Sequence, residues 1–182
     1  MRPQTDEELM LAFKGGDAGA YEELFARYKN AIYGYLRRRL NDPSRAEELT
    51  QDVFLALVER RNGYEVRAGF RTYLYRIALY RLASELRQRS AAHGPADPPV
   101  AASEPETVVQ VREALAKLDD DHRDVLILRE YQQLSYAEIA AVLNLPVGTV
   151  RSRLFRAKLA LKDLLLGAAP VPGPAAGGAG SV

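Results

Sequence analysis

Apolar residues recur three and four positions apart along most of this 182-residue chain, with polar residues between them. This spacing places apolar side chains on one face of an α-helix, and the segments lack the alternating β-branched runs that are typical of strands. In the first half of the chain the pattern predicts helices over residues 9–14, 21–40, 46–59 and 70–89. The sequence therefore predicts an all-α fold.

Short polar segments separate these helices. Gly-Gly-Asp at 15–17 and Asn-Asp-Pro-Ser at 41–44 interrupt the apolar pattern. Ser44 and Glu47 have the spacing of a capping box, in which each side chain accepts a backbone amide hydrogen at the start of a helix. We therefore expect Ser44 to cap the third helix.

The stretch 134–158 shows two short helical patterns around a turn. Ser135 and Glu138 again have capping-box spacing, which predicts a helix from Tyr136. Asn144 suits a left-handed helix stop, and Pro146 is tolerated near the start of a second helix. This arrangement predicts a helix-turn-helix.

Composition divides the chain into two small helical domains, predicted over residues 5–89 and 106–166. Between them, residues 90–105 are rich in proline, alanine, glycine and serine, which is typical of a flexible linker. Residues 167–182 carry no charge, no aromatic ring and no periodicity, so we expect a disordered tail.

Composition also excludes several kinds of chemistry. The chain has no cysteine, and its two histidines, His93 and His122, belong to no plausible triad or metal set. Three adjacent aspartates, residues 119–121, cannot all face one ion, so we expect them to cap a helix. We predict no enzyme activity, no cofactor and no metal site. With no apolar signal core and no run of about 18 apolar residues, the sequence predicts a cytoplasmic protein without stable membrane insertion.

Residues 46–59 carry an acidic stripe with an apolar centre on one helical face. Its members are Glu48, Gln51, Asp52 and Leu55. The stripe is either a solvated surface with one stray leucine or a docking surface for a basic partner.

The helix over 70–89 places an apolar face opposite a face that mixes tyrosine and arginine. Arginine neutralises phosphates and a tyrosine ring stacks on an exposed base, so this face and the preceding loop suit nucleic acid. Alternatively, the tyrosines pack at the edge of a helical bundle and the arginines are solvated. The candidate residues are Arg60, Arg61, Tyr64, Arg67, Tyr73, Arg76, Tyr80 and Arg87.

The second helix of the helix-turn-helix has a basic outer face around an exposed phenylalanine. An arginine in the major groove contacts guanine or phosphate, and an apolar ring meets a thymine methyl group. A helix whose outer face only contacts water would not need an exposed phenylalanine ring. The candidate DNA-binding residues are Gly148, Thr149, Arg151, Ser152, Phe155, Arg156 and Lys158.

Four segments follow one another in a familiar order: "GDAGAYEELFARY", "AEELTQDVFLALV", "FRTYLYRIALYRL" and "LSYAEIAAVLNLPVGTVRSRLFRAK". Together they resemble the bacterial RNA polymerase sigma factors of the extracytoplasmic-function (ECF, group IV) family, over about residues 6–166. The first three resemble region 2 of that family, and the last resembles its region 4. The resemblance implies an alternative sigma factor that binds core RNA polymerase and directs promoter-specific transcription initiation.

The resemblance assigns a role to each surface. The acidic stripe would dock on the clamp helices of the largest polymerase subunit, and the flap of the second largest subunit is a further expected contact. The 70–89 helix and its loop would read the minus-ten element and help open it, and the helix-turn-helix would read the minus-thirty-five element as duplex. Core polymerase, promoter DNA and an anti-sigma factor are the expected partners.

Some residues depart from the family pattern. Tyr73, Tyr80 and Ser84 stand where the family usually has Trp, Asn and Asp, so the usual polar contacts do not carry over to the last two. Two other functions stay open: a sigma-like decoy that titrates an anti-sigma factor, and a stand-alone helix-turn-helix regulator. A decoy would not need an intact DNA-reading helix, and the regulator would leave the acidic stripe unexplained.

Overall fold

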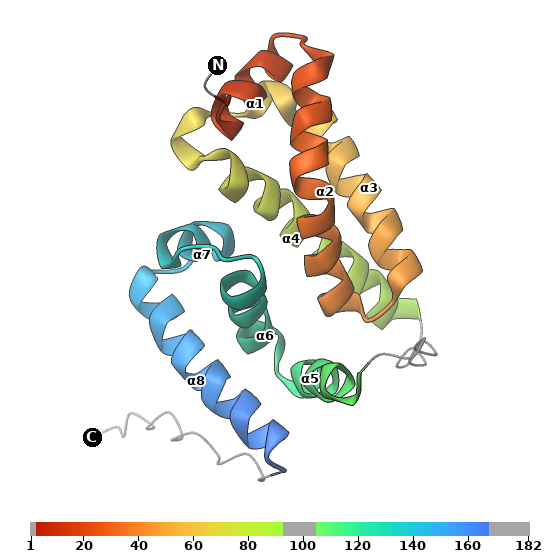
Figure 1. Cartoon of the computed structure of the whole chain (residues 1–182), viewed down its shortest axis with the longest axis vertical. Helices are drawn as coiled ribbons and strands as arrows, with labels where there is room; N and C mark the ends of the chain where they lie inside the picture. Colours follow the sequence, from red (N-terminus) through yellow and green to blue (C-terminus); the bar gives the residue numbers. More distant parts are fainter. Residues whose placement is uncertain (1–2, 93–104, 168–182) are drawn as a thin grey trace, which may run out of the picture.

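The structure is a computed structural model that describes residues 3–92 and 105–167, and every regular element in these residues is helical (Figure 1). The N-terminal part contains α1 (Asp6–Lys14), α2 (Ala18–Leu40), α3 (Pro43–Arg60) and α4 (Phe70–Ala92), with short 3-10 turns at Arg61–Gly63 and Val66–Ala68. The C-terminal part contains α5 (Glu106–Lys117), α6 (Asp120–Leu126), the π-helical segment η3 (Ile127–Tyr131), α7 (Tyr136–Leu143) and α8 (Val147–Leu165). The predicted all-α class is confirmed.

The start of α3 differs from the prediction. Asp42 is the capping residue, since its Oδ1 accepts the Arg45 amide hydrogen at 3.0 Å, and Pro43 occupies the first helical turn. Proline fits there because its φ is preset and it lacks an amide hydrogen that would need an acceptor. The predicted capping box of Ser44 and Glu47 is therefore wrong, because Ser44 already lies inside the helix.

The helix-turn-helix has the predicted local geometry. Ser135 Oγ accepts from the Glu138 amide at 3.1 Å, and Glu138 Oε2 accepts from the Ser135 amide at 2.7 Å. Asn144 ends α7 in the left-handed region with φ 53°. Asp119 caps α6 by accepting from the His122 amide at 2.9 Å, as expected for the aspartate cluster.

Long-range contacts fix the start of α4. Gly69 has φ +66°, a conformation that glycine adopts without strain, and it turns the chain into the helix. Glu7 on α1 then accepts the Phe70 amide hydrogen at 3.0 Å, which caps α4 from a distant helix. The predicted apolar face of α4 lies in the core, where Leu74 and Leu82 are buried.

The N-terminal and C-terminal parts pack against each other. Helix α4 lies beside α7 (Figure 1), and α2 contacts η3. The buried apolar residues of both parts form one cluster. Of the predicted linker, residues 90–92 continue α4 and residues 93–104 lie outside the described range. The predicted tail from 168 onward also lies outside it, so the domain boundaries remain a prediction. Within the described residues, no helix is long and apolar enough to cross a membrane.

Candidate nucleic-acid interface

The outer face of α8 is solvent-accessible along its first three turns. Val150, Leu154 and Ala157 are buried and anchor the helix. Their burial leaves Phe155 72% exposed on the opposite side, a large apolar side chain that nothing in the described structure covers. Five of the predicted DNA-binding residues share this exposed face: Gly148, Arg151, Ser152, Phe155 and Arg156.

Two further predicted residues on α8 have local partners. Thr149 is half-buried, and its carbonyl oxygen accepts from Ser152 Oγ at 3.0 Å. Lys158 Nζ lies 2.8 Å from Glu130 Oε1 on η3. Both side chains of this ion pair are about half exposed to solvent.

A second exposed cluster lies where α3, the following loop and α4 meet. Tyr80 is 56% exposed, and the Arg60 guanidinium lies 5.3 Å from its ring centre. Tyr73 donates its hydroxyl hydrogen to the Arg60 carbonyl at 2.9 Å, and burial raises the pKa of the Tyr73 phenol. Arg87 is exposed two turns beyond Tyr80. An aromatic ring beside a cation is the kind of surface on which an unpaired base stacks.

Tyr64 does not present its ring to solvent, contrary to the prediction. It is 1% exposed and packs edge-on against Tyr73, with ring centres 5.2 Å apart, and against Phe70. Burial raises the pKa of its phenol to about 12. The two 3-10 turns fold the loop back so that this ring joins the core, where aromatic burial is more favourable than exposure.

The remaining loop arginines differ in their surroundings. Arg61 donates to the Val58 carbonyl at 3.0 Å and is half-buried, with its guanidinium 5.9 Å from the Phe13 ring centre. Arg67 is fully accessible and pairs with Glu65 at 3.0 Å. Loop arginines with such different partners do not form one continuous basic site.

Arg76 contacts the C-terminal part of the chain. Its Nε donates to the Ala141 carbonyl on α7 at 2.8 Å. This predicted minus-ten residue therefore faces the helix-turn-helix in the present arrangement. Arg60 and Tyr80, which the sequence assigned to the same surface as Arg76, lie against each other instead.

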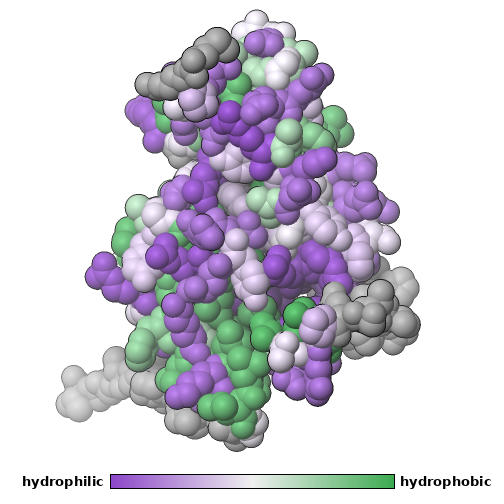
Figure 2. All heavy atoms as spheres, in the orientation of Figure 1, coloured by the Kyte–Doolittle hydropathy of each residue, from purple (hydrophilic) through white to green (hydrophobic). Residues whose placement is uncertain are grey.

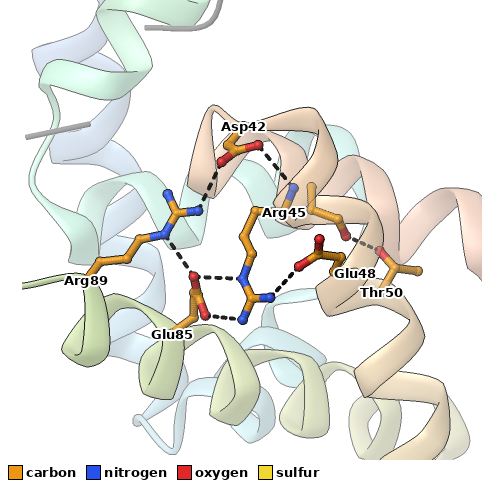
Figure 3. A network of polar contacts seen from close by, with 7 residues as sticks. Asp42, Arg45, Glu48, Thr50, Glu85 and Arg89 are labelled. Carbon is orange, nitrogen blue, oxygen red and sulfur yellow. Dashed lines mark hydrogen bonds and ion pairs between the residues drawn. The ribbon is translucent and has the colours of Figure 1, made fainter. Parts of the chain in front are cut away.

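Three members of the acidic stripe on α3 are exposed, namely Glu48, Gln51 and Leu55, and Asp52 is half-buried. Leu55, in the centre of the stripe, is 55% exposed. Glu48, at one end of the stripe, pairs with Arg45, whose Nη1 lies 2.5 Å from Glu48 Oε2 (Figure 3). Arg45 is in turn held by buried Glu85 on α4, and Arg89 links Glu85 to Asp42. No local pattern predicts this network, because its contacts between α3 and α4 join Arg45 to Glu85 and Asp42 to Arg89, which are 40 and 47 residues apart.

The protein-family comparison matches both parts of the chain. The Sigma-70 region 2 model matches residues 24–92, and the Sigma-70 region 4 model matches residues 109–161. The RNA polymerase sigma-H factor of Pseudomonas aeruginosa is 30% identical over 182 aligned positions, covering 89% of this chain and 94% of that protein. The chain belongs to the ECF RNA polymerase sigma factors. It directs promoter-specific transcription by RNA polymerase, and proteins of this family are transcription regulators.

Other relatives of this sigma factor agree. ECF RNA polymerase sigma factor SigW of Bacillus subtilis is 30% identical over 173 positions, covering 84% of this chain and 92% of SigW. Among solved structures, CnrH in complex with the cytosolic domain of CnrY has a TM-score of 0.75 and 28% identity, covering 89% of this chain and 97% of CnrH. A match over this length includes both helical parts of the sigma factor.

Proposed function

We propose that this sigma factor reads its promoter with two separate surfaces. Helix α8 enters the major groove of the minus-thirty-five element, where Arg151 and Arg156 contact bases or phosphates and Phe155 meets a thymine methyl group. The exposed Phe155 between two arginines is the observation that carries this proposal, because solubility alone does not favour an apolar ring there.

The minus-ten element is read by α4 and the preceding loop. Tyr80 and Arg60 provide the accessible stacking and charge, while Arg87 extends the basic face along α4. Tyr73, held by the Arg60 carbonyl, lies at the edge of this surface. Tyr80 and Ser84 stand where the family usually has Asn and Asp. This replacement supports a preference for a minus-ten sequence that differs from the one other family members select.

The α3 stripe docks on core polymerase. Its charges, from Glu48 and Asp52, flank Leu55 and suit the basic, partly apolar surface that the clamp helices would offer. A second apolar surface covers the end of α8, where Leu159, Leu165 and Leu166 are exposed; Figure 2 shows hydrophobic side chains gathered over this part of the molecule. This surface is the candidate contact for the polymerase flap. Catalysis stays with the polymerase, and an anti-sigma factor is the proposed inhibitor.

Run-off transcription tests the proposal. Purified core polymerase is given a library of upstream genomic fragments, with and without this sigma factor. Defined new start sites that share two spaced motifs are the expected result. An absence of initiation, together with tight binding to an anti-sigma protein, would reject the proposal in favour of the decoy.

A further inference from the structure

A groove lies between the C-terminal half of α2 and helix α5, with Tyr131 of η3 beside it. Its volume is about 520 Å³, which falls in the range of about 300–1,000 Å³ that is typical of small-molecule sites. Helix α2 contributes mainly charged and polar side chains to the lining, and α5 contributes mainly apolar ones. The groove therefore has two chemically different walls.

A stacked guanidinium and aromatic ring form one part of the lining. The guanidinium carbon of Arg38 lies 3.9 Å from the centre of the Tyr131 ring, and Arg38 Nη1 donates to the Gly34 carbonyl at 2.8 Å. A Cβ atom at position 34 would lie 3.1 Å from Arg38 Nη1, so glycine makes room for this close approach. Because a guanidinium has five N–H groups, the bond to Gly34 leaves donors for a further ligand.

The charge of the groove is positive. Arg37 and Arg112 line it together with Arg38, and Arg37 Nη1 donates to the uncharged Asn41 side chain at 3.2 Å. Among the residues that the structure describes, no aspartate or glutamate lines the groove, and neither Arg37 nor Arg38 forms an ion pair. Hydrogen bonds between two ionised groups are stronger than those between neutral ones, so this wall favours an anionic ligand.

The wall from α5 is apolar. Val108, Val111 and Leu115 are spaced three and four residues apart, which places them on one face of the helix. Val108 is 49% exposed and Tyr131 is 41% exposed, so the groove leaves two large apolar side chains accessible to solvent. A ligand that covers them gains free energy by removing apolar surface from water.

We propose that this groove binds a medium-chain organic carboxylate. Arg37 and Arg38 hold its head group, and its chain lies along Val108 and Val111. A helical peptide is the alternative occupant, but two turns of a helix about 10 Å across fill roughly 850 Å³, which is more than the groove holds. The groove residues belong to none of the surfaces proposed for promoter or polymerase binding, so this site goes beyond the proposed function.

Isothermal titration calorimetry of the full chain with octanoate tests the site. One octanoate should bind per chain. Two further compounds separate the parts of the ligand: 1-octanol has the chain without the charge, and acetate has the charge without the chain. Each of them should bind about tenfold more weakly than octanoate or less tightly still, because the site recognises both parts.

Matched variants locate the binding. Val108→Glu should weaken octanoate binding about tenfold, because the new carboxylate repels that of the ligand. Leu11→Glu on α1 is the control, since Leu11 is 47% exposed and lies outside the groove. Arg37→Gln should weaken binding about threefold and reduce its dependence on salt, because one positive charge is removed. Circular dichroism checks that each variant is folded, and Arg37→Gln still tests the site if Val108→Glu does not fold.

Several results would overturn the site. They are the absence of saturable octanoate binding, equal affinity for octanoate and 1-octanol, and equal losses in the Val108 and Leu11 variants. Binding of a synthetic amphipathic peptide of leucine and glutamate in place of octanoate would also overturn it, and would assign the groove to a protein partner.

Discussion

Arg45 donates to both carboxylate oxygens of Glu85, from Nε to Oε1 at 2.9 Å and from Nη2 to Oε2 at 2.6 Å. This bidentate pair joins α3 to α4, so it connects the helix with the docking stripe to the helix with the minus-ten surface (Figure 3). Glu85 is buried, and its hydrogen bonds from Arg45 lower the pKa of its carboxyl group. The pair thus makes one rigid support for two proposed functional surfaces.

Replacing Glu85 by glutamine should destabilise the protein by about 1–3 kcal/mol at pH 7, because Arg45 and Arg89 lose a charged acceptor. The lowered pKa contributes stability that is fully present above the ordinary glutamate pKa of about 4.3 and is lost as the pH falls through the folded-state value. Urea unfolding at pH 7 and at acid pH measures both effects. The exposed ion pair of Glu65 and Arg67 provides the control, since Glu65→Gln should lower the stability by at most about 1 kcal/mol. Equal losses for the two variants would contradict the structural role of Glu85.

Arg151→Ala and Arg156→Ala should each weaken minus-thirty-five recognition by roughly 1–3 kcal/mol if the side chain contacts a base. Run-off transcription on promoters with altered minus-thirty-five sequences measures the change in selectivity. Arg153→Ala is the matched control, because Arg153 is turned toward α6 and pairs with Asp121 at 3.1 Å. Unchanged promoter selectivity in both test variants would contradict direct recognition of bases by this face of α8.

Asp52→Lys should reduce binding to core polymerase, because it reverses a charge next to exposed Leu55 on the docking stripe. Thermal unfolding should be nearly unchanged, since neither side chain is buried. Co-purification with core enzyme measures the binding, and Glu113→Lys on exposed α5 controls for the charge change. Normal co-purification of Asp52→Lys would argue that polymerase uses another surface.

Asn144→Ala should destabilise the helix-turn-helix by about 1 kcal/mol, because alanine is strained at φ 53°. Asn144→Gly should have little or no cost, since glycine adopts this conformation freely. Chemical denaturation of the two variants compares the same position with and without a Cβ atom. Similar stabilities for the alanine and glycine variants would show that the turn relaxes to another conformation.

The sequence by itself determined the local structure. Apolar periodicity predicted α2, α3 and α4 close to their observed extents, and the capping box at Ser135 with the left-handed Asn144 located the turn before α8. These features depend on residues within one or two helical turns of each other, so the residues that predict each feature lie close together in the sequence. The exposed face of α8 followed directly, because burying Val150 and Leu154 turns Phe155 and its neighbouring arginines outward.

Only the tertiary structure decided which side chains are accessible and what holds them. Tyr64 lies in a loop, yet its ring is buried against Phe70. Glu7 caps α4 from 63 residues away in the sequence. Arg76 faces α7, and Arg39 meets Asp124 across 85 positions of sequence, a spacing that no local pattern encodes. Such contacts depend on how helix faces from distant segments pack together, since burial and ion pairing respond to three-dimensional distance rather than to separation along the chain.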